Sequence, residues 1–365
     1  MDKYITIDVQ EGTDINLYLE PENNDTPIKI VSGDEQQTIL LDTNGVTDNY
    51  HAGTATMTIY GDLRGFWCLN NGITGIDISH NTTLKWLSCS CNQLTALDVS
   101  HNTALDNLDC SNNQLTALDV SNNTALRHLN CSGNQLTALD VSNNTALVNL
   151  YFEKNQLTAL DISHNTDLWG FDCSENQLTT LDISHNTALG DFSISDNYIS
   201  NITLAETYPN AHRIVLIKNQ LSTEKINSIF CALPDNNDYG EIEVYGDTLE
   251  DVYMYNSYLA TNKSIATDKH WFVIGNHSEA ANTTGDYVCG SGLNDISDND
   301  INIYPNPAKD EIVLTNVFNE IVKIFDVNGR LVKQEIVNQR MNISDLQSGV
   351  YYLQIRNTNK KIIVK

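Results

Sequence analysis

Aromatic and basic side chains recur at variable positions of a 21-residue repeat, where they could anchor a binding partner. The segment LTALDVSNNTAL, for example, begins at residue 115 and again at residue 136. Large aromatic rings bury much surface at a small entropic cost, and arginine adds charge-assisted hydrogen bonds, so both are common interface anchors. We predict the following ligand-binding set: Trp67, Trp86, Arg127, His128, Tyr151, Trp169 and Arg213. The competing interpretation is that each of these side chains only shields neighbouring edges of the fold.

One aspartate per repeat forms a second column of equivalent positions. Carboxylates stacked about 5 Å apart repel one another unless each is hydrogen-bonded locally or shares a cation. We favour hydrogen bonds to nearby Ser, Thr and backbone groups, and the alternative is a calcium ladder through Asp98, Asp119 and Asp140. Histidines alternate with asparagines at one exposed position of the repeat, which argues against a metal role for them. We therefore expect no cofactor and no metal site.

Cysteine also recurs at a single repeat position. The members of this column are Cys68, Cys89, Cys110, Cys131 and Cys173. Two further repeats carry Phe152 and Ile194 at this position, so cysteine is interchangeable with apolar residues there. This pattern predicts a ladder of buried thiols rather than disulfides or metal ligands. Cys231 and Cys289 lie outside the ladder, and a disulfide between them is one possibility.

The elements that must position these columns are the coils of a leucine-rich repeat solenoid. Six complete repeats begin at 21-residue intervals from Ile73 and run to Ile199. A period of 20 to 29 residues with the pattern L-x-x-L-x-L-x-x-N-x-L predicts one short strand per coil. The strands should stack about 4.8 Å apart in a parallel sheet on the concave face. Asn113 and its equivalents are expected to hydrogen-bond the turning backbone.

Composition and patterning divide the chain into five segments. Residues 1–60 alternate apolar and polar positions and predict a β-rich N-terminal cap, followed by the solenoid over 61–222. Residues 223–275 predict an α/β C-terminal cap, and the polar, Gly-, Asn- and Asp-rich residues 276–300 a linker. Residues 301–365 alternate like the strands of an immunoglobulin-like β-sandwich. The predicted fold class is thus an α/β-type leucine-rich repeat solenoid, mostly strand and loop, with a β cap and a C-terminal sandwich.

Charge separates the last segment from the rest of the chain. The net charge is -27, yet residues 301–365 hold nine Lys/Arg and six Asp/Glu, so this segment is +3 and the remainder -30. Such a negative field disfavours nucleic acid and anionic membranes as partners. No uncharged apolar run reaches the roughly 18 residues that a membrane span needs. The N-terminus also lacks the apolar core of a signal peptide.

The C-terminal residues carry several short motifs in a fixed order. The run Tyr304-Pro305-Asn306-Pro307 is followed by an Asp-Val-Asn-Gly turn, by the stretch LQSGVY and by a lysine-rich terminus. These motifs resemble the C-terminal sorting domain of type IX secretion cargo. The resemblance implies sorting-motif roles for Pro305, Asn306, Pro307, Gly329, Gly349 and Tyr351. It also implies recognition by the type IX secretion machinery, a secreted or outer-surface location in a Gram-negative cell, and a signal peptide absent from this sequence.

The repeats resemble the 21-residue, cysteine-laddered coils of internalin-like and other leucine-rich bacterial adhesins. This resemblance implies attachment to host matrix, host cells or other bacteria, so we expect an adhesin that recognises a protein through its concave face. The alternatives are a glycan-binding surface protein and, less favoured, a secreted enzyme. The motifs H-E-x-x-H, G-x-S-x-G and G-x-x-x-x-G-K-[ST] are absent. We therefore predict no catalytic residues.

Overall fold

The computed structural model describes residues 2–235, 240–243, 266, 269, 271–274, 303–304, 307–314, 320–327, 329–337, 340–355 and 358–365. Two compact units form, residues 1–289 and residues 290–365. The described residues are mostly strand and loop, and helix is represented by α1 (Thr223–Ala232). The predicted linker, residues 276–300, lies outside the described residues.

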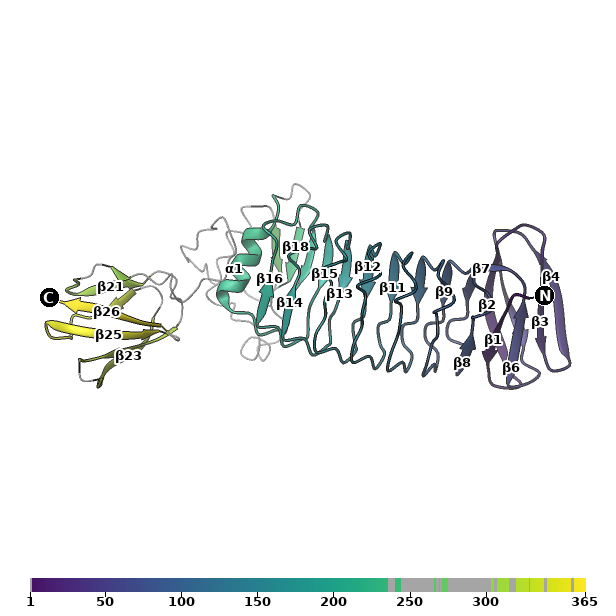
Figure 1. The fold of residues 1–365 in the computed structure, drawn as a ribbon, viewed down its shortest axis with the longest axis horizontal. Helices are drawn as coiled ribbons and strands as arrows, with labels where there is room; N and C mark the ends of the chain where they lie inside the picture. Colours follow the sequence, from purple (N-terminus) through teal and green to yellow (C-terminus); the bar gives the residue numbers. More distant parts are fainter. Residues whose placement is uncertain are drawn as a thin grey trace. The chain divides into compact units, whose positions relative to one another are not determined.

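The first unit is a leucine-rich repeat solenoid, as predicted. Its coils follow one another from the N-terminal strands to α1, and each adds one strand to a parallel sheet (Figure 1). These strands are β7 (Leu63–Trp67), β9 (Trp86–Ser88), β10 (Asn107–Asp109), β11 (His128–Asn130), β12 (Asn149–Tyr151), β13 (Gly170–Asp172), β15 (Asp191–Ser193) and β17 (Arg213–Val215). The middle residue of each three-residue strand is buried, and most of its neighbours are partly exposed. Residues one repeat apart lie opposite one another, so the predicted columns become rows across the sheet.

The cysteine column forms the predicted ladder of buried thiols. All five of its cysteines are free and fully buried, and Phe152 and Ile194 fill the same position in their coils. Burial raises the pKa of these thiols, to about 12 for Cys89 and Cys131. The thiols therefore stay protonated and act as small apolar side chains in the core.

Two ladders of buried asparagines tie adjacent coils together. In the predicted ladder, Asn113 Nδ2 donates to the carbonyls of Cys89 at 3.0 Å and Cys110 at 3.1 Å, and Oδ1 accepts from Leu94 N at 3.0 Å. The second ladder, which we did not predict, contains Asn81, Asn102, Asn123, Asn144, Asn165 and Asn186, all fully buried. Asn102 Nδ2, for instance, donates to the carbonyl of Asn81 at 2.9 Å. The asparagines of each coil thus satisfy backbone groups of the preceding coil.

The N-terminal residues form antiparallel strands that extend the solenoid in two ways. The strands are β1 (Tyr4–Asp8), β2 (Asp14–Pro21), β3 (Thr26–Ser32), β4 (Glu35–Leu41), β5 (Val46–His51) and β6 (Thr56–Tyr60). Four of them form a sheet in the order β4-β3-β6-β1, completed by β8 (Gly75–Asp77). The other two, β2 and β5, continue the parallel sheet beyond β7, which makes it twelve strands wide.

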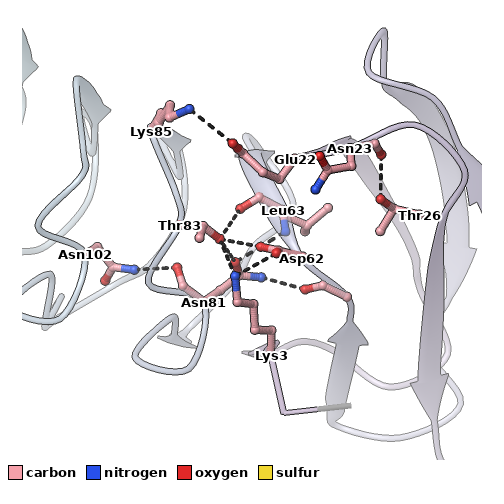
Figure 2. Close-up of polar contacts among 11 residues, drawn as sticks. Lys3, Glu22, Asn23, Thr26, Asp62, Leu63, Asn81, Thr83, Lys85 and Asn102 are labelled. Atoms are coloured by element: carbon pink, nitrogen blue, oxygen red, sulfur yellow. Dashed lines mark hydrogen bonds and ion pairs between the residues drawn. The ribbon is translucent and has the colours of Figure 1, made fainter.

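Polar contacts fasten the N-terminal strands to the first coils (Figure 2). Lys3 Nζ lies 2.7 Å from Asp62 Oδ2, and Lys85 Nζ lies 3.4 Å from Glu22 Oε1. Asn81 begins the second asparagine ladder here by donating to the carbonyl of residue 61 at 2.9 Å. A single apolar core runs from the N-terminal strands through every coil. The cap and the solenoid are therefore one continuous structure.

The other end of the solenoid is closed by α1 and two more parallel strands. Ser222 caps α1 by accepting a hydrogen bond from Lys225 N, a role that serine commonly takes at a helix N-terminus. The strands β18 (Gly240–Glu243) and β19 (Trp271–Ile274) continue the sheet in parallel. One pair of parallel strands, β14 (Thr180–Asp182) with β16 (Asn201–Thr203), lies outside this sheet. Cys231 is disulfide-bonded, and Cys289 lies outside the described residues.

The second unit is antiparallel. Its strands are β20 (Ile303–Tyr304), β21 (Glu311–Leu314), β22 (Glu320–Phe325), β23 (Leu331–Val337), β24 (Arg340–Asn342), β25 (Gly349–Ile355) and β26 (Thr358–Val364). They form sheets in the orders β20-β21-β24 and β23-β22-β25-β26, and side chains of both sheets share one apolar core. Immunoglobulin-like connectivity stays a prediction.

Candidate functional site

The predicted ligand-binding residues lie on or beside the outward side of the twelve-stranded sheet, which we call the sheet face. Trp67 and Tyr151 share one row of outward side chains, and Trp86, His128 and Arg213 share the next. Arg127 and Trp169 come one residue before their strands. All seven side chains are partly or largely exposed.

The structure spreads these residues over several strands and does not gather them into one site. Seven strand intervals separate β7, which carries Trp67, from β17, which carries Arg213. At the usual strand spacing of about 4.8 Å, that is about 34 Å. Two groups result: an N-terminal group around Trp67 and Trp86, and a C-terminal group around Tyr151, Trp169 and Arg213. Arg127 and His128 lie between the groups.

The N-terminal group includes residues of the cap that sequence reasoning missed. Tyr18 on β2 packs against Trp67 at 4.8 Å between ring centroids, with the ring planes at 77°. Glu20, two residues further along β2, accepts a hydrogen bond from Arg64 Nε at 2.9 Å. The Arg64 guanidinium in turn lies 5.2 Å from the centroid of the Trp86 ring. The cap therefore completes the surroundings of both tryptophans.

These residues border a concavity of about 580 Å³, which we call the N-terminal pocket. Its lining is Asn16, Tyr18, Glu20, Thr47, Trp67, Leu69 and Trp86. Ligand pockets commonly measure about 300–1,000 Å³ and combine aromatic walls with a few polar groups. The N-terminal pocket has both properties.

Glycines let three aromatic side chains of the sheet face approach the backbone closely. A Cβ added at Gly65 would lie 2.3 Å from Trp67 Cζ3, and one at Gly170 would lie 2.6 Å from the Tyr151 hydroxyl. A Cβ at Gly190 would lie 2.3 Å from Trp169 Nε1. Any larger residue would have to displace the ring at each position. Sequence analysis did not predict this arrangement, although a glycine beside an aromatic residue at otherwise polar repeat positions could have indicated it.

The C-terminal group is surrounded by carboxylates. Burial raises the pKa of Tyr151, and the negative charges of Asp191, Asp172 and Glu153 raise it further. Burial also raises the pKa of Asp172, although hydrogen bonds from Ser174 oppose this effect. The region therefore has a negative potential that would attract basic groups.

Arg213 and Trp169 complete the C-terminal group. Arg213 lies 3.6 Å from Asp191 and 3.5 Å from Glu243, so it offsets part of the negative charge. The Trp169 ring lies 5.3 Å from the His212 ring, and the residue is 40% exposed. Between the groups, His128 Nδ1 accepts a hydrogen bond from an amide on β12 at 2.8 Å, and Arg127 is exposed.

The aspartate column is held by local hydrogen bonds of the kind that we favoured. In Asp98, Asp119 and Asp140, Oδ1 accepts from the backbone N of the serine two residues later at 2.9 Å. Hydrogen bonds from the side chain and backbone of this serine lower the pKa of each carboxyl group. Within the ranges that the structure describes, no three His, Cys, Asp or Glu side chains gather as a metal site.

Most of the predicted sorting-motif residues lie in described turns and strands of the second unit. Gly329 adopts a φ of +79° in a turn, where its N donates to the carbonyl of Asp326 at 3.0 Å. Gly349 begins β25, and the Tyr351 hydroxyl donates to the carbonyl of residue 347 at 2.9 Å. Pro307 precedes β21, whereas Pro305 and Asn306 lie outside the described residues.

Comparison with solved structures finds other leucine-rich repeat proteins. The functional domain of InlJ from Listeria monocytogenes, which includes a cysteine ladder, is 25% identical, with 60% of each chain covered and a TM-score of 0.37. An internalin (inlF) from Listeria monocytogenes is 20% identical over 58% of this chain and 67% of that one, with a TM-score of 0.46. A leucine-rich repeat protein from Leptospira interrogans is 21% identical over 54% and 50%, with a TM-score of 0.43. The chain thus spans about 60% of the InlJ domain.

Sequence comparison assigns the C-terminal unit. No curated protein matches the chain. Residues 302–365, however, match the family of secretion system C-terminal sorting domains. Among the described residues, no helix has the length and apolar character needed to cross a membrane. The family match identifies residues 302–365 as a type IX sorting domain, and a protein that carries this domain is secreted or displayed on the cell surface.

Proposed function

We propose that the protein is a secreted or surface-anchored adhesin that binds a partner protein on the sheet face. One observation carries the proposal: the scaffold positions repeat almost unchanged, while the outward rows vary from coil to coil. The buried leucine, cysteine and asparagine columns hold every coil in the same conformation. Outward residues can change without affecting that core, which is how solenoids present binding surfaces.

The side chains of the C-terminal group support a particular kind of protein partner. Tyr151 and Trp169 offer aromatic contact area, and Asp172, Asp191 and Glu153 add negative charge around them. The whole chain carries a net charge of -27. A partner with a basic patch would therefore be steered to this region, and its association rate should fall as ionic strength rises.

Binding of the full chain to a panel of matrix and cell-surface proteins tests the proposal. We expect at least one partner whose affinity falls tenfold or more in the variants Tyr151→Ala and Trp169→Ala. The matched control is Tyr198→Ala, because Tyr198 is 53% exposed and lies outside the sheet strands. A partner that binds both variants and the control equally well would contradict a role for the sheet face.

We further propose that the protein acts by binding and not by catalysis. The acids of the repeats recur in columns that are held by local hydrogen bonds, which supports a structural role for them. Assays against protein and polysaccharide substrates should show no turnover. Turnover that survives purification and is lost in a single carboxylate variant would contradict this proposal.

A further inference from the structure

We infer that the N-terminal pocket binds an uncharged saccharide. This inference rests on the proposed function, because the pocket belongs to the same sheet face. The pocket lies at the N-terminal end of that face, whereas the proposed protein partner binds the C-terminal group. It adds a ligand class, and it adds cap residues that belong to none of the solenoid columns.

The N-terminal pocket is built where two parts of the chain meet. Thr47 on β5, Tyr18 on β2 and Trp67 on β7 are consecutive partners across three antiparallel strands. Trp86 follows on β9, the next strand of the sheet. A continuous core and the polar contacts of Figure 2 join the cap to these coils, so the pocket walls are fixed relative to one another. The pocket is therefore formed before any ligand arrives, which lowers the entropic cost of binding.

The aromatic side chains provide flat apolar walls. Trp67 lies over Gly65 and against Tyr18, and the Tyr18 hydroxyl donates to the carbonyl of Asn44 at 2.7 Å. These contacts hold both rings in place, while Trp67 and Trp86 remain partly exposed. The apolar C–H face of a pyranose ring stacks well on such surfaces, because it is flat and of similar size to an aromatic ring.

Charge compensation inside the pocket favours an uncharged ligand. Glu20 is 8% exposed, and its charge is neutralised by Arg64. The same guanidinium lies over the Trp86 ring, so the protein itself supplies the cation for that aromatic face. A cationic ligand would be repelled by Arg64 at short range, and an anionic one by Glu20 and by the net charge of the chain.

The polar lining matches the hydroxyl groups of a saccharide. Asn16 and Thr47 contribute an amide and a hydroxyl. Glu20 Oε1 accepts the hydrogen bond from Arg64. Glu20 lines the pocket, and a carboxylate oxygen is a strong acceptor for a ligand hydroxyl. Aromatic walls with a few such groups suit a molecule that has apolar faces and hydroxyl edges.

Binding of the full chain to an oligosaccharide array tests the inference. The array carries neutral oligosaccharides of hexoses and N-acetylhexosamines beside their sialylated and sulfated counterparts. We expect binding to one or more neutral saccharides, with the affinity then measured by titration calorimetry. In the variant Trp67→Ala the affinity should fall at least tenfold. Thr47→Arg should have the same effect, because it fills the pocket from an exposed position on β5 and leaves the core intact.

The matched control is Thr38→Arg, the same substitution at an exposed position of β4, which belongs to the other sheet. It should bind saccharide within twofold of the unchanged chain. Failure of every neutral saccharide to bind, preference for charged ones, or binding that Thr47→Arg leaves intact would overturn the inference. The inference would also fail if no saccharide bound and the pocket instead bound a proline-rich peptide, with that binding lost in Thr47→Arg.

The two proposals fail in different ways. Loss of saccharide binding with intact binding of a partner protein that requires Tyr151 would leave the proposed function standing and remove only the pocket inference. The reverse result, saccharide binding that requires Trp67 with no protein partner, would keep the pocket inference and replace protein adhesion by glycan capture.

Discussion

The solenoid and the sorting domain are both built from strands, but they bury their apolar side chains differently. Solenoid strands such as β10 are three residues long, parallel, and bury a single central side chain. Strands β23, β25 and β26 of the sorting domain are seven residues long and antiparallel. The solenoid thus gains stability from many identical small contributions, and the sorting domain gains it from a few long strands.

The exposed surfaces of the two regions also differ, both in the residue types that they present and in their charge. The sheet face of the solenoid is mixed, with aromatic, charged and amide side chains. The four-stranded sheet of the sorting domain exposes apolar side chains: Ile321 is 50% exposed and Ile336, its direct partner across the sheet, 67%. The charges are opposite as well, -30 for residues 1–300 and +3 for the last 65. The comparison shows that an apolar residue type in a strand does not by itself indicate that the side chain is buried in the core.

Truncating one apolar residue in each region should give the largest difference in the free energy of unfolding between variants of the two regions. Leu129 is 1% exposed in β11, so Leu129→Ala should lower the free energy of unfolding by about 2–5 kcal/mol. Ile336→Ala should change it by less than about 0.5 kcal/mol, because the side chain is already largely in solvent. Denaturant unfolding followed by circular dichroism measures both values. Equal losses would show that the Ile336 side chain is covered in solution.

A glycine substitution in each region should give a smaller difference. In Gly170→Ala the new methyl group must displace the Asn149 and Tyr151 side chains, so we expect a loss of about 1–3 kcal/mol and weaker binding of the protein partner. At Gly349 a Cβ would meet Tyr351 at 3.5 Å, an ordinary contact. Gly349→Ala should therefore change stability by less than about 1 kcal/mol. Thermal unfolding tests both variants, and a neutral Gly170→Ala would mean that the Tyr151 ring moves without cost.

The smallest effect concerns pH and is confined to the solenoid. Hydrogen bonds from Ser121 lower the pKa of Asp119, so these bonds stabilise the folded state above the unfolded pKa of about 3.9. That stabilisation is lost as pH falls through the lower folded pKa. In Ser121→Ala, the pKa of Asp119 should rise toward about 3.9, and less stability should be lost on acidification.

NMR titration of the carboxyl groups measures this change within one sample. Asp140 is an internal control, because its pKa is lowered by Ser142, which the variant retains. A fall in the Asp119 pKa, or an equal rise at Asp140, would contradict the local origin of the shift.

The sequence predicted those features that depend on the repeat period. Cys110 and Asn113 recur in register, so their burial and their bonds follow from one coil stacking on the next. The second asparagine ladder could have been found by the same reasoning, since Asn102 recurs at every period. Those predictions are reliable because each contact joins residues one period apart.

The pocket could not be predicted in full, because it depends on contacts without a period. Alternation in the segment DINLYLEP predicts a strand with Tyr18 and Glu20 on one side. It does not indicate that this strand pairs antiparallel with the first coil. In that pairing Tyr18 lies opposite Trp67, which is 49 residues later in the sequence. Trp67 and Trp86 were identified from their residue types, but their partners were not. In the sorting domain, likewise, alternation does not distinguish the outward Ile321 from the inward Val322.

The asparagine ladders have a consequence for the reach of the molecule. Because each coil bonds its predecessor through the same atoms, a whole 21-residue unit can be inserted or removed without creating a new kind of junction. Each added coil would move the N-terminal pocket about 4.8 Å further from α1 along the sheet. The number of repeats therefore sets the distance between the N-terminal pocket and the C-terminal end of the solenoid. The residues at the two ends, and their chemistry, stay the same.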